Sequence, residues 1–252
     1  MGIFDTSSSS PEFQALVTRW DSYLKKLEAR YYEVLQAAEE PLNDIINNIQ
    51  YDDVVMYNLS QGLKNQTVDQ LGKKAEEGWF KMRAEMEKIG AGWKEISAQN
   101  EKMGAFKIFL EIEFDKYSVK LFARSARKIL ENVQNHVNMN KLHRCTQCGA
   151  ELPIKIYSFI SVNIKCESCG SVNTYQPDDR IRGLEWYVIN HLAEEQAFDL
   201  KLKGRSNKEF AKEYYRKYYG FLMENVPDKK EFYERDMNER LGWVDTRPAP
   251  YF

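Results

Sequence analysis

Two short cysteine motifs constrain the fold of this chain more than any other feature of its sequence. Cys145 and Cys148 form one Cys-x2-Cys-Gly motif, Cys166 and Cys169 form the second, and the chain has no other cysteine. Each motif presents two thiolates from one tight turn, and two such turns brought together supply four soft ligands in a tetrahedron. The glycine after each motif suits a sharp turn, because glycine tolerates positive φ. The spacing therefore predicts one tetrahedral zinc site with these four ligands.

The predicted ligand set favours a structural zinc ion over a catalytic one. A catalytic zinc keeps one position open for water, whereas four thiolates fill the shell and weaken Lewis acidity. We therefore expect the binding free energy of zinc to contribute to folding. His143, two residues before Cys145, is an alternative ligand or a hydrogen-bond partner of a sulfur. A redox role for either Cys-x-x-Cys pair is a further alternative, although no βαβ pattern surrounds it.

Cysteine usage and hydropathy predict a cytoplasmic protein. All four thiols belong to the metal motif, which fits a reducing compartment better than a disulfide framework. No apolar run approaches the roughly 18 residues of a membrane-spanning helix, and the N-terminus lacks the features of a secretory signal. The start from Met1 to Thr6 matches the N-myristoylation template, so lipidation of the N-terminus stays open. We expect no transmembrane segment.

Helical spacing of apolar residues dominates the N-terminal half. Ser9 and Glu12 form a capping box with Pro11 in the first turn, and the stripe that follows is expected to end or kink at Pro41. After a shorter helical piece, residues 52–62 show no regular pattern and are expected to be irregular.

A second apolar stripe has the spacing of a coiled-coil seam. Its members step by four and three without a miss: Ala75, Trp79, Met82, Met86, Ile89, Trp93, Ile96, Asn100 and Met103. The spacing predicts that this seam packs either within the chain or against a second copy, which would make a homodimer through residues 75–103. The glycines at 90 and 92 mark a bend or a close approach to a neighbour.

Residues 106–122 fit two patterns, because Ile108, Leu110 and Ile112 alternate as in a strand while Phe106, Leu110 and Phe114 also fit a helix. Neither Pro nor Gly separates this stretch from the helical pattern that continues to Asn140. We therefore favour one helix from about Ala105 to Asn140, antiparallel to the preceding one, with a hairpin as the alternative.

The stretch after the first cysteine motif is rich in β-branched and aromatic residues. A strand is predicted within residues 154–165 and a second within 171–175, and a hairpin between the motifs would fold one knuckle onto the other. Helical patterns follow, capped by Asp178 or Asp179, by Ser206 with Glu209, and by Pro227 with Asp228. The last residues, 247–252, are expected to be extended and mobile or docked on a neighbour.

A basic and aromatic helix over residues 201–219 is the candidate for a nucleic-acid surface. Its basic residues are Lys201, Lys203, Arg205, Lys208, Lys212, Arg216 and Lys217. Basic residues attract phosphates and tyrosines stack on bases, which suits single-stranded nucleic acid. In the alternative interpretation, the aromatic residues form one buried helix face and the charges pair outside it. The net charge of −2 for the whole chain gives no general argument for a polyanionic partner.

No enzyme motif occurs in the sequence. The P-loop, the dinucleotide-binding glycine fingerprint, the nucleophile elbow and the His-Glu-x-x-His zinc motif are all absent. The three histidines show no spacing for a catalytic site. We therefore predict a protein that is not an enzyme.

The two cysteine knuckles with strands between and after them resemble a C4 zinc ribbon over about residues 143–177. That resemblance implies that Cys145, Cys148, Cys166 and Cys169 are the four zinc ligands of a module that holds a fold together or grips protein or nucleic acid. The order of long helices and then a ribbon is also similar to bacterial coiled-coil proteins with a C-terminal zinc ribbon. Those proteins act as chaperones or adaptors in flagellar and type III secretion systems, whereas here about a third of the chain follows the ribbon.

Together these patterns predict a mainly α protein of long antiparallel, coiled-coil-like helices with an inserted small β zinc ribbon and a C-terminal helical segment. The expected divisions are a disordered leader over residues 1–10, a helical region over 11–142, the ribbon over 143–177, a helical region over 178–243 and a tail over 244–252. We expect a scaffold or adaptor that binds a protein partner with one structural Zn²⁺. The alternative is a nucleic-acid-binding protein that uses residues 201–219 with the ribbon as support.

Overall fold

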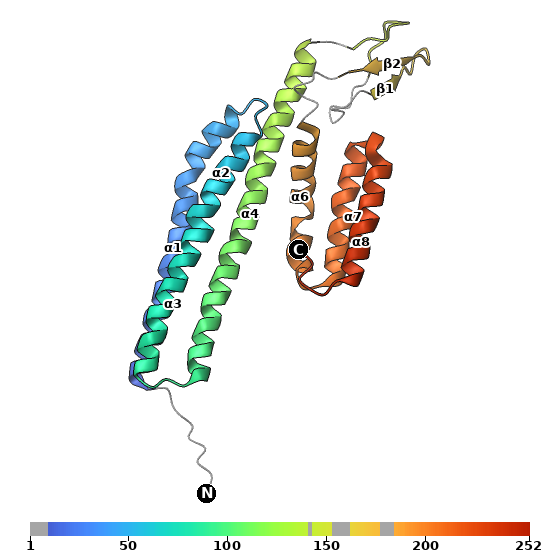
Figure 1. Cartoon of the computed structure of the whole chain (residues 1–252). Coiled ribbons are helices and arrows are strands. Elements are labelled where there is room, and N and C mark those ends of the chain that lie inside the picture. Colours follow the sequence, from blue (N-terminus) through green and yellow to red (C-terminus); the bar gives the residue numbers. More distant parts are fainter. Residues whose placement is uncertain (1–9, 141–142, 153–161, 177–183) are drawn as a thin grey trace. The chain divides into compact units, whose positions relative to one another are not determined.

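The structure is a computed structural model that describes residues 10–140, 143–152, 162–176 and 184–252. It confirms the predicted mainly α fold (Figure 1). The elements of the N-terminal half are α1 (Pro11–Asn47), α2 (Val54–Lys64), the π-helical turn η1 (Asn65–Asp69), α3 (Gln70–Lys88) and α4 (Trp93–Asn140). The elements after them are β1 (Val162–Lys165), β2 (Val172–Tyr175), α6 (Leu184–Gly204), α7 (Lys208–Asn225), the 3₁₀ turn η2 (Pro227–Lys229) and α8 (Lys230–Thr246).

The chain divides into two compact units. The N-terminal unit comprises Met1–Asn43 and Tyr57–Tyr117, and the C-terminal unit comprises Asp44–Met56 and Ser118–Phe252. The long helices α1 and α4 therefore contribute residues to both units. Within the described ranges, no helix combines the length and the apolar character needed to cross a membrane.

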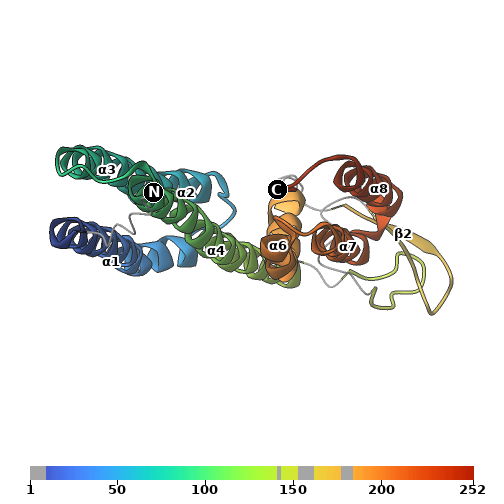
Figure 2. The same ribbon diagram turned by 90° about the horizontal axis from the view of Figure 1, so that it is seen from below.

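Figures 1 and 2 show α1, α3 and α4 running along one another in the N-terminal unit, which also contains most of α2. Lys102 on α4 pairs with Asp21 on α1 at 2.6 Å, and Tyr117 farther along α4 donates to Glu39 farther along α1. The second pair lies closer to the C-terminal end of both helices than the first pair does, so α1 and α4 are parallel. The turn between α3 and α4 makes α3 antiparallel to both, as expected for neighbouring helices with a short connection.

The core of this unit is built around aromatic and methionine side chains. Trp20 on α1 is fully buried, its ring lies 5.8 Å from that of Trp79, and Phe13, Met82 and Met86 complete the cluster. The members of the predicted seam on α3 are thus buried against other helices of the same chain. Of the two alternatives for this seam, packing within the chain and packing against a second copy, these residues show the first.

The predicted seam from Ala75 to Met103 does not lie on one helix, although Ile96 and Met103 still pack against the core cluster. The helix α3 ends at Lys88, and Gly90 adopts a left-handed conformation with φ of 76°. The Ala91 amide donates to the Met86 carbonyl at 3.0 Å, which is the Schellman arrangement that ends a helix. Of the two alternatives for the glycines, a bend or a close approach, the structure shows the bend. Trp93, a predicted seam residue, is 74% exposed.

Three further helix boundaries differ from the sequence-based expectations. The helix α1 continues through Pro41 to Asn47, and the segment 52–62 is not irregular, because α2 begins at Val54 with its amide bonded to the Asp52 carboxylate at 3.1 Å. The helical alternative for residues 106–122 is confirmed, although the helix begins at Trp93 and not near Ala105. The start of α2 within this segment is explained by Asp52, because a single aspartate that accepts from a backbone amide can start a helix.

Helix caps also differ in detail. Asn207, and not Ser206, caps α7, since its side-chain oxygen accepts from the Glu209 and Phe210 amides at 3.0 and 3.3 Å. At the start of α1, Ser10 accepts from the Phe13 amide at 3.2 Å, while Ser9 of the predicted capping box lies outside the described residues, as do Asp178 and Asp179.

In the C-terminal unit, α6, α7 and α8 pack as successive antiparallel helices. Tyr218 on α7 donates to Asn190 on α6, and Tyr219 on α7 donates to Asp236 on α8. The residues after α8 fold back, because the Tyr251 amide donates to the Arg205 carbonyl at 3.2 Å and the Phe252 ring lies 4.9 Å from that of Tyr214. Of the two expectations for residues 247–252, the docked one holds, within the same chain.

Two glycines of α3 offer a matched test of the N-terminal core. A Cβ on Gly78 would lie 2.5 Å from Cε1 of Tyr23, whereas a Cβ on Gly72 would meet nothing within 4 Å. We expect Gly78→Ala to lower the free energy of unfolding by about 1–3 kcal/mol, because the Tyr23 ring must move. Gly72→Ala should raise it by about 0.5–1 kcal/mol, because the unfolded chain loses entropy. Chemical denaturation measures both, and a Gly78→Ala variant as stable as Gly72→Ala would contradict the packing described.

Candidate metal centre

Both cysteine motifs fold as the same backbone turn. The Gly149 amide donates to the Cys145 carbonyl at 2.9 Å, and the Gly170 amide donates to the Cys166 carbonyl at 2.8 Å. Each of these glycines has a left-handed φ, 76° and 75°, which a side chain would make costly. In each turn, the amide of the first cysteine also donates to the carbonyl after the glycine, at 2.7 and 2.8 Å. Two backbone hydrogen bonds therefore hold each knuckle, as the glycine spacing predicts.

Short antiparallel pairings carry the two knuckles. Strands β1 and β2 pair with Val162 opposite Tyr175 and Lys165 opposite Val172, so the second knuckle is the turn of this hairpin. The first knuckle lies between Arg144 and Glu151, which form an isolated antiparallel bridge. Residues 153–161, where most of the predicted first strand falls, lie outside the described residues. The described backbone thus places each pair of cysteines in the turn that connects two antiparallel segments.

The structure brings together the four cysteines that the sequence predicts as ligands. All four Sγ atoms lie within 4.8 Å of one another. The closest pairs join the two knuckles, with Cys145 Sγ 3.5 Å from Cys169 Sγ and Cys148 Sγ 3.6 Å from Cys166 Sγ. A tetrahedron of sulfurs about 2.3 Å from a central ion has edges of about 3.8 Å. The cluster therefore fits one four-coordinate metal ion.

Burial and hydrogen bonding differ among the four thiols. Cys145 and Cys166 are buried, whereas Cys148 and Cys169 are exposed. The Ser171 hydroxyl lies 3.0 Å from Cys145 Sγ and 3.1 Å from Cys169 Sγ. This hydroxyl lowers the pKa of Cys145 to about 5, although burial opposes the shift. Cys145 is therefore readily a thiolate, which is the form that binds metal.

Cys148 shows the opposite behaviour. Its pKa rises to about 12, because the shift to lower pKa from the Ala150 amide is outweighed by hydrogen bonds to the sulfurs of Cys169 and Cys166 and by desolvation. Cys148 therefore favours its protonated form beside these sulfurs. A metal ion would displace this proton, so metal binding should release protons.

Two polar residues of the site were missed by the sequence analysis. Ser171 and Asn173 lie just after the second knuckle, and the Asn173 carboxamide is buried with 7% exposure. Its Nδ2 donates to Cys145 Sγ at 3.5 Å, and its Oδ1 accepts from the Thr146 amide and hydroxyl at 2.9 and 3.0 Å. The signal that could have found Asn173 is its inward position on β2, two residues from Tyr175, which is also buried.

Two described histidines, His143 and His191, are not members of the sulfur cluster. The metal-ligand group found among the described residues contains the four cysteines and not His143, whose ring packs edge-on against Tyr175 at 4.6 Å. His191 on α6 stacks on Phe122 at 4.5 Å and meets Tyr187 edge-on at 4.5 Å. Each of these two side chains thus makes aromatic contacts.

Two of the four tyrosines in the predicted basic-aromatic helix are buried packing residues. Tyr214 and Tyr219 are 6% and 5% exposed, and the Tyr214 hydroxyl donates to Glu194. Burial and the carboxylate of Glu194 raise the pKa of Tyr214, so its hydroxyl stays a donor. The structure therefore places these two rings inside the helical packing, where they offer bases no exposed stacking surface.

Several of the basic residues are paired as well. Lys201 pairs with Glu194 at 2.6 Å, and Lys208 and Lys212 pair with Asp245 at 2.8 and 2.7 Å. The two lysines at Asp245 lower the pKa of this carboxyl to about 2. Three of the seven predicted phosphate-binding cations thus have a carboxylate partner in the chain.

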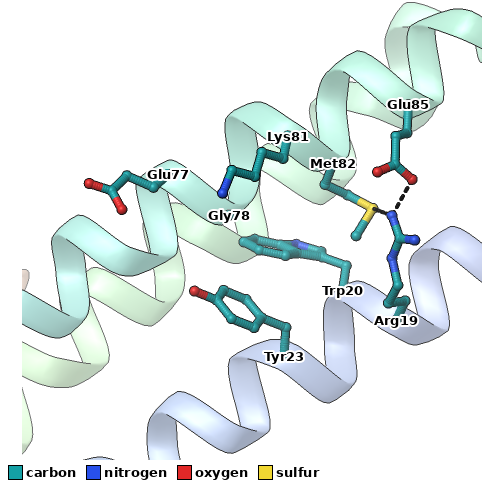
Figure 3. Close-up of a pocket in the computed structure, with 8 residues that line it drawn as sticks. All are labelled: Arg19, Trp20, Tyr23, Glu77, Gly78, Lys81, Met82 and Glu85. Carbon is teal, nitrogen blue, oxygen red and sulfur yellow. Dashed lines mark hydrogen bonds and ion pairs between the residues drawn. The ribbon is translucent and has the colours of Figure 1, made fainter.

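A separate groove of about 300 Å³ lies between α1 and α3 in the N-terminal unit (Figure 3). Trp20, Tyr23 and Met82 form its apolar wall, and the ion pair of Arg19 with Glu85 closes one end. An apolar wall with charges at its rim is suited to hold a side chain of another molecule.

No protein-family model, curated protein or solved structure matches this chain. The fold and the site define a mainly α-helical protein with a small β module whose four cysteines are positioned to bind one metal ion.

The burial of His191 predicts a pH dependence of stability. Burial lowers the pKa of His191 to about 4, although Glu194 opposes the shift. Its pKa in an unfolded chain is about 6.5, so on acidification the unfolded chain binds the proton first. Stability should fall between pH 6.5 and 4, by up to about 3 kcal/mol from this residue. His191→Phe keeps the ring stacking and removes the titration, so its denaturation midpoint should fall less over this range. Equal losses in both proteins would contradict the assignment.

Proposed function

We propose that this protein is a non-enzymatic scaffold or adaptor that binds a protein partner, with one structural Zn²⁺ in its cysteine ribbon. The observation that carries the metal assignment is the cluster of four Sγ atoms within 4.8 Å at the tips of two knuckles. Four thiolates suit zinc or an iron–sulfur centre, and a closed shell of four cysteines is typical of structural zinc. A metal ion with four cysteine ligands has no open coordination position for a substrate, which supports a role in binding a partner over a role in catalysis.

Exposed apolar side chains of the N-terminal unit support a protein partner. Phe80 on α3 is 66% exposed and Trp93 at the start of α4 is 74% exposed. Aromatic residues of this kind are common energetic centres of protein interfaces. The groove between α1 and α3, with Met82 in its wall, adds an apolar recess on the same unit.

The zinc assignment predicts how much zinc the protein contains and what the protein loses when two of the ligands are replaced. Elemental analysis of untagged full-length protein should find one zinc per chain, because four ligands bind one ion. Cys145→Ser with Cys166→Ser should abolish zinc binding and lower stability by several kcal/mol, because metal binding is coupled to folding. Ser168→Ala, which changes a non-ligand inside the second knuckle, is the control and should keep zinc. Metal-free wild type, or a melting temperature unchanged by complete chelation, would contradict the proposal.

The partner assignment predicts how binding responds to salt and to mutation. A partner captured from the native source should stay bound as salt rises from about 0.1 to 0.5 M, because an apolar interface is little screened. Trp93→Ala with Phe80→Ala should weaken this binding at least tenfold, because each ring is a candidate anchor. Trp186→Ala, an equally large change at a 63% exposed tryptophan of the C-terminal unit, is the control. Binding of single-stranded nucleic acid that falls steeply with salt, together with no effect of the double variant, would favour a nucleic-acid-binding function.

A further inference from the structure

We infer that Asn173 is a positioning residue of the metal centre, which ties the two knuckles together and orients Cys145 as its most firmly held ligand. This inference rests on the proposed metal binding and deepens it. Asn173 lies on β2, opposite Ile164 of β1 in the hairpin that carries the second knuckle. Its hydrogen bonds reach the first knuckle, so one side chain joins the two halves of the site.

The oxygen and the nitrogen of this carboxamide have different partners. Oδ1 accepts from the backbone amide of Thr146 at 2.9 Å and from the Thr146 hydroxyl at 3.0 Å. Nδ2 lies 3.5 Å from Cys145 Sγ and 3.4 Å from both the carbonyl and the hydroxyl oxygen of Ser171. The acceptor thus fixes the backbone between the first two cysteines, and the donor points to a ligand sulfur and to the second knuckle.

Burial makes these bonds consequential. The side chain of Asn173 is 7% exposed, so water cannot replace partners that are lost. An N–H donor to a thiolate also withdraws electron density from the sulfur and fixes its orientation, as partners of metal ligands generally do. Cys145 Sγ accepts from two N–H groups, of Asn173 and of the Gln147 backbone at 3.4 Å, and also lies 3.0 Å from the Ser171 hydroxyl.

The test compares release of metal from full-length variants. Protein loaded with zinc or cobalt(II) is mixed with an excess of chelator, and the rate of metal release is followed by absorbance. Asn173→Ala should release metal roughly 10- to 100-fold faster than wild type, the range found when partners of metal ligands are removed. Asn173→Asp keeps an acceptor for Thr146 but turns an anionic oxygen toward the thiolate, so it should release metal at least as fast as Asn173→Ala.

A second readout separates positioning of the sulfur from general stability. The sulfur-to-cobalt charge-transfer band should shift in both Asn173 variants, because the N–H donor to Cys145 is lost. Asn163→Ala is the matched control, since Asn163 lies on the neighbouring strand, is exposed, and bonds only Thr174 among the contacts described, at 2.9 Å. This control should keep the release rate and the spectrum of wild type.

Each outcome decides the inference. Release from Asn173→Ala at the wild-type rate overturns it while leaving the metal site intact. Release from Asn173→Asp at the wild-type rate also overturns it, because the donor to sulfur would then be dispensable. A wild type that binds no cobalt or zinc overturns the proposed metal site and this inference with it, so the two failures are distinguishable.

Discussion

The feature on which the small β module is centred is the cluster of four sulfurs, which are positioned to bind one metal ion. Burial is described for residues 143–152 and 163–176 of this module. The buried side chains in these two ranges are Cys145, Cys166, Asn173 and Tyr175. In this described part of the module, the buried side chains are therefore mostly cysteine ligands and polar or aromatic neighbours, and apolar burial there is small relative to the entropy of ordering the knuckles. Metal binding supplies the missing free energy in such modules, which is why the ligand sulfurs and their donors occupy the position of a hydrophobic core.

The helical units are stabilised in a different way. In the N-terminal unit, Trp20 and Trp79 bury most of their rings at the centre of three helices, and ion pairs such as Lys107 with Glu76 lie at the margins. Exposed ion pairs contribute little, so apolar packing provides most of the stability there. In the C-terminal unit, buried tyrosines combine both effects, since the rings pack while the hydroxyls bond Glu194 and Asp236. Loss of the metal should therefore affect the β module far more than the helices.

Local patterns explain which features could be predicted. The knuckles depend on residues within six positions of one another, so Cys-x2-Cys-Gly was sufficient to predict their turns. The seam spacing did not reveal the break between α3 and α4, because it continues across Gly90, where a left-handed glycine ends α3. Asn173 could not be predicted, because its partner Thr146 belongs to the other knuckle and the sequence does not specify how the knuckles meet. The composition of α7 was equally ambiguous, since only the positions of α6 and α8 decide that Tyr214 and Tyr219 face inward.

The differences among the sulfurs bear on how the site can work. Cys145 and Cys166 are buried and follow a β-bridge or a strand, whereas Cys148 and Cys169 are exposed at the outer end of each turn. Each close sulfur pair joins one buried and one exposed thiol from opposite knuckles. An ion bound among them is thus held by both knuckles on its inner side and meets solvent on the side of Cys148 and Cys169. Such an arrangement crosslinks the chain as a structural metal does, because removing the ion separates the two knuckles as well as opening each turn.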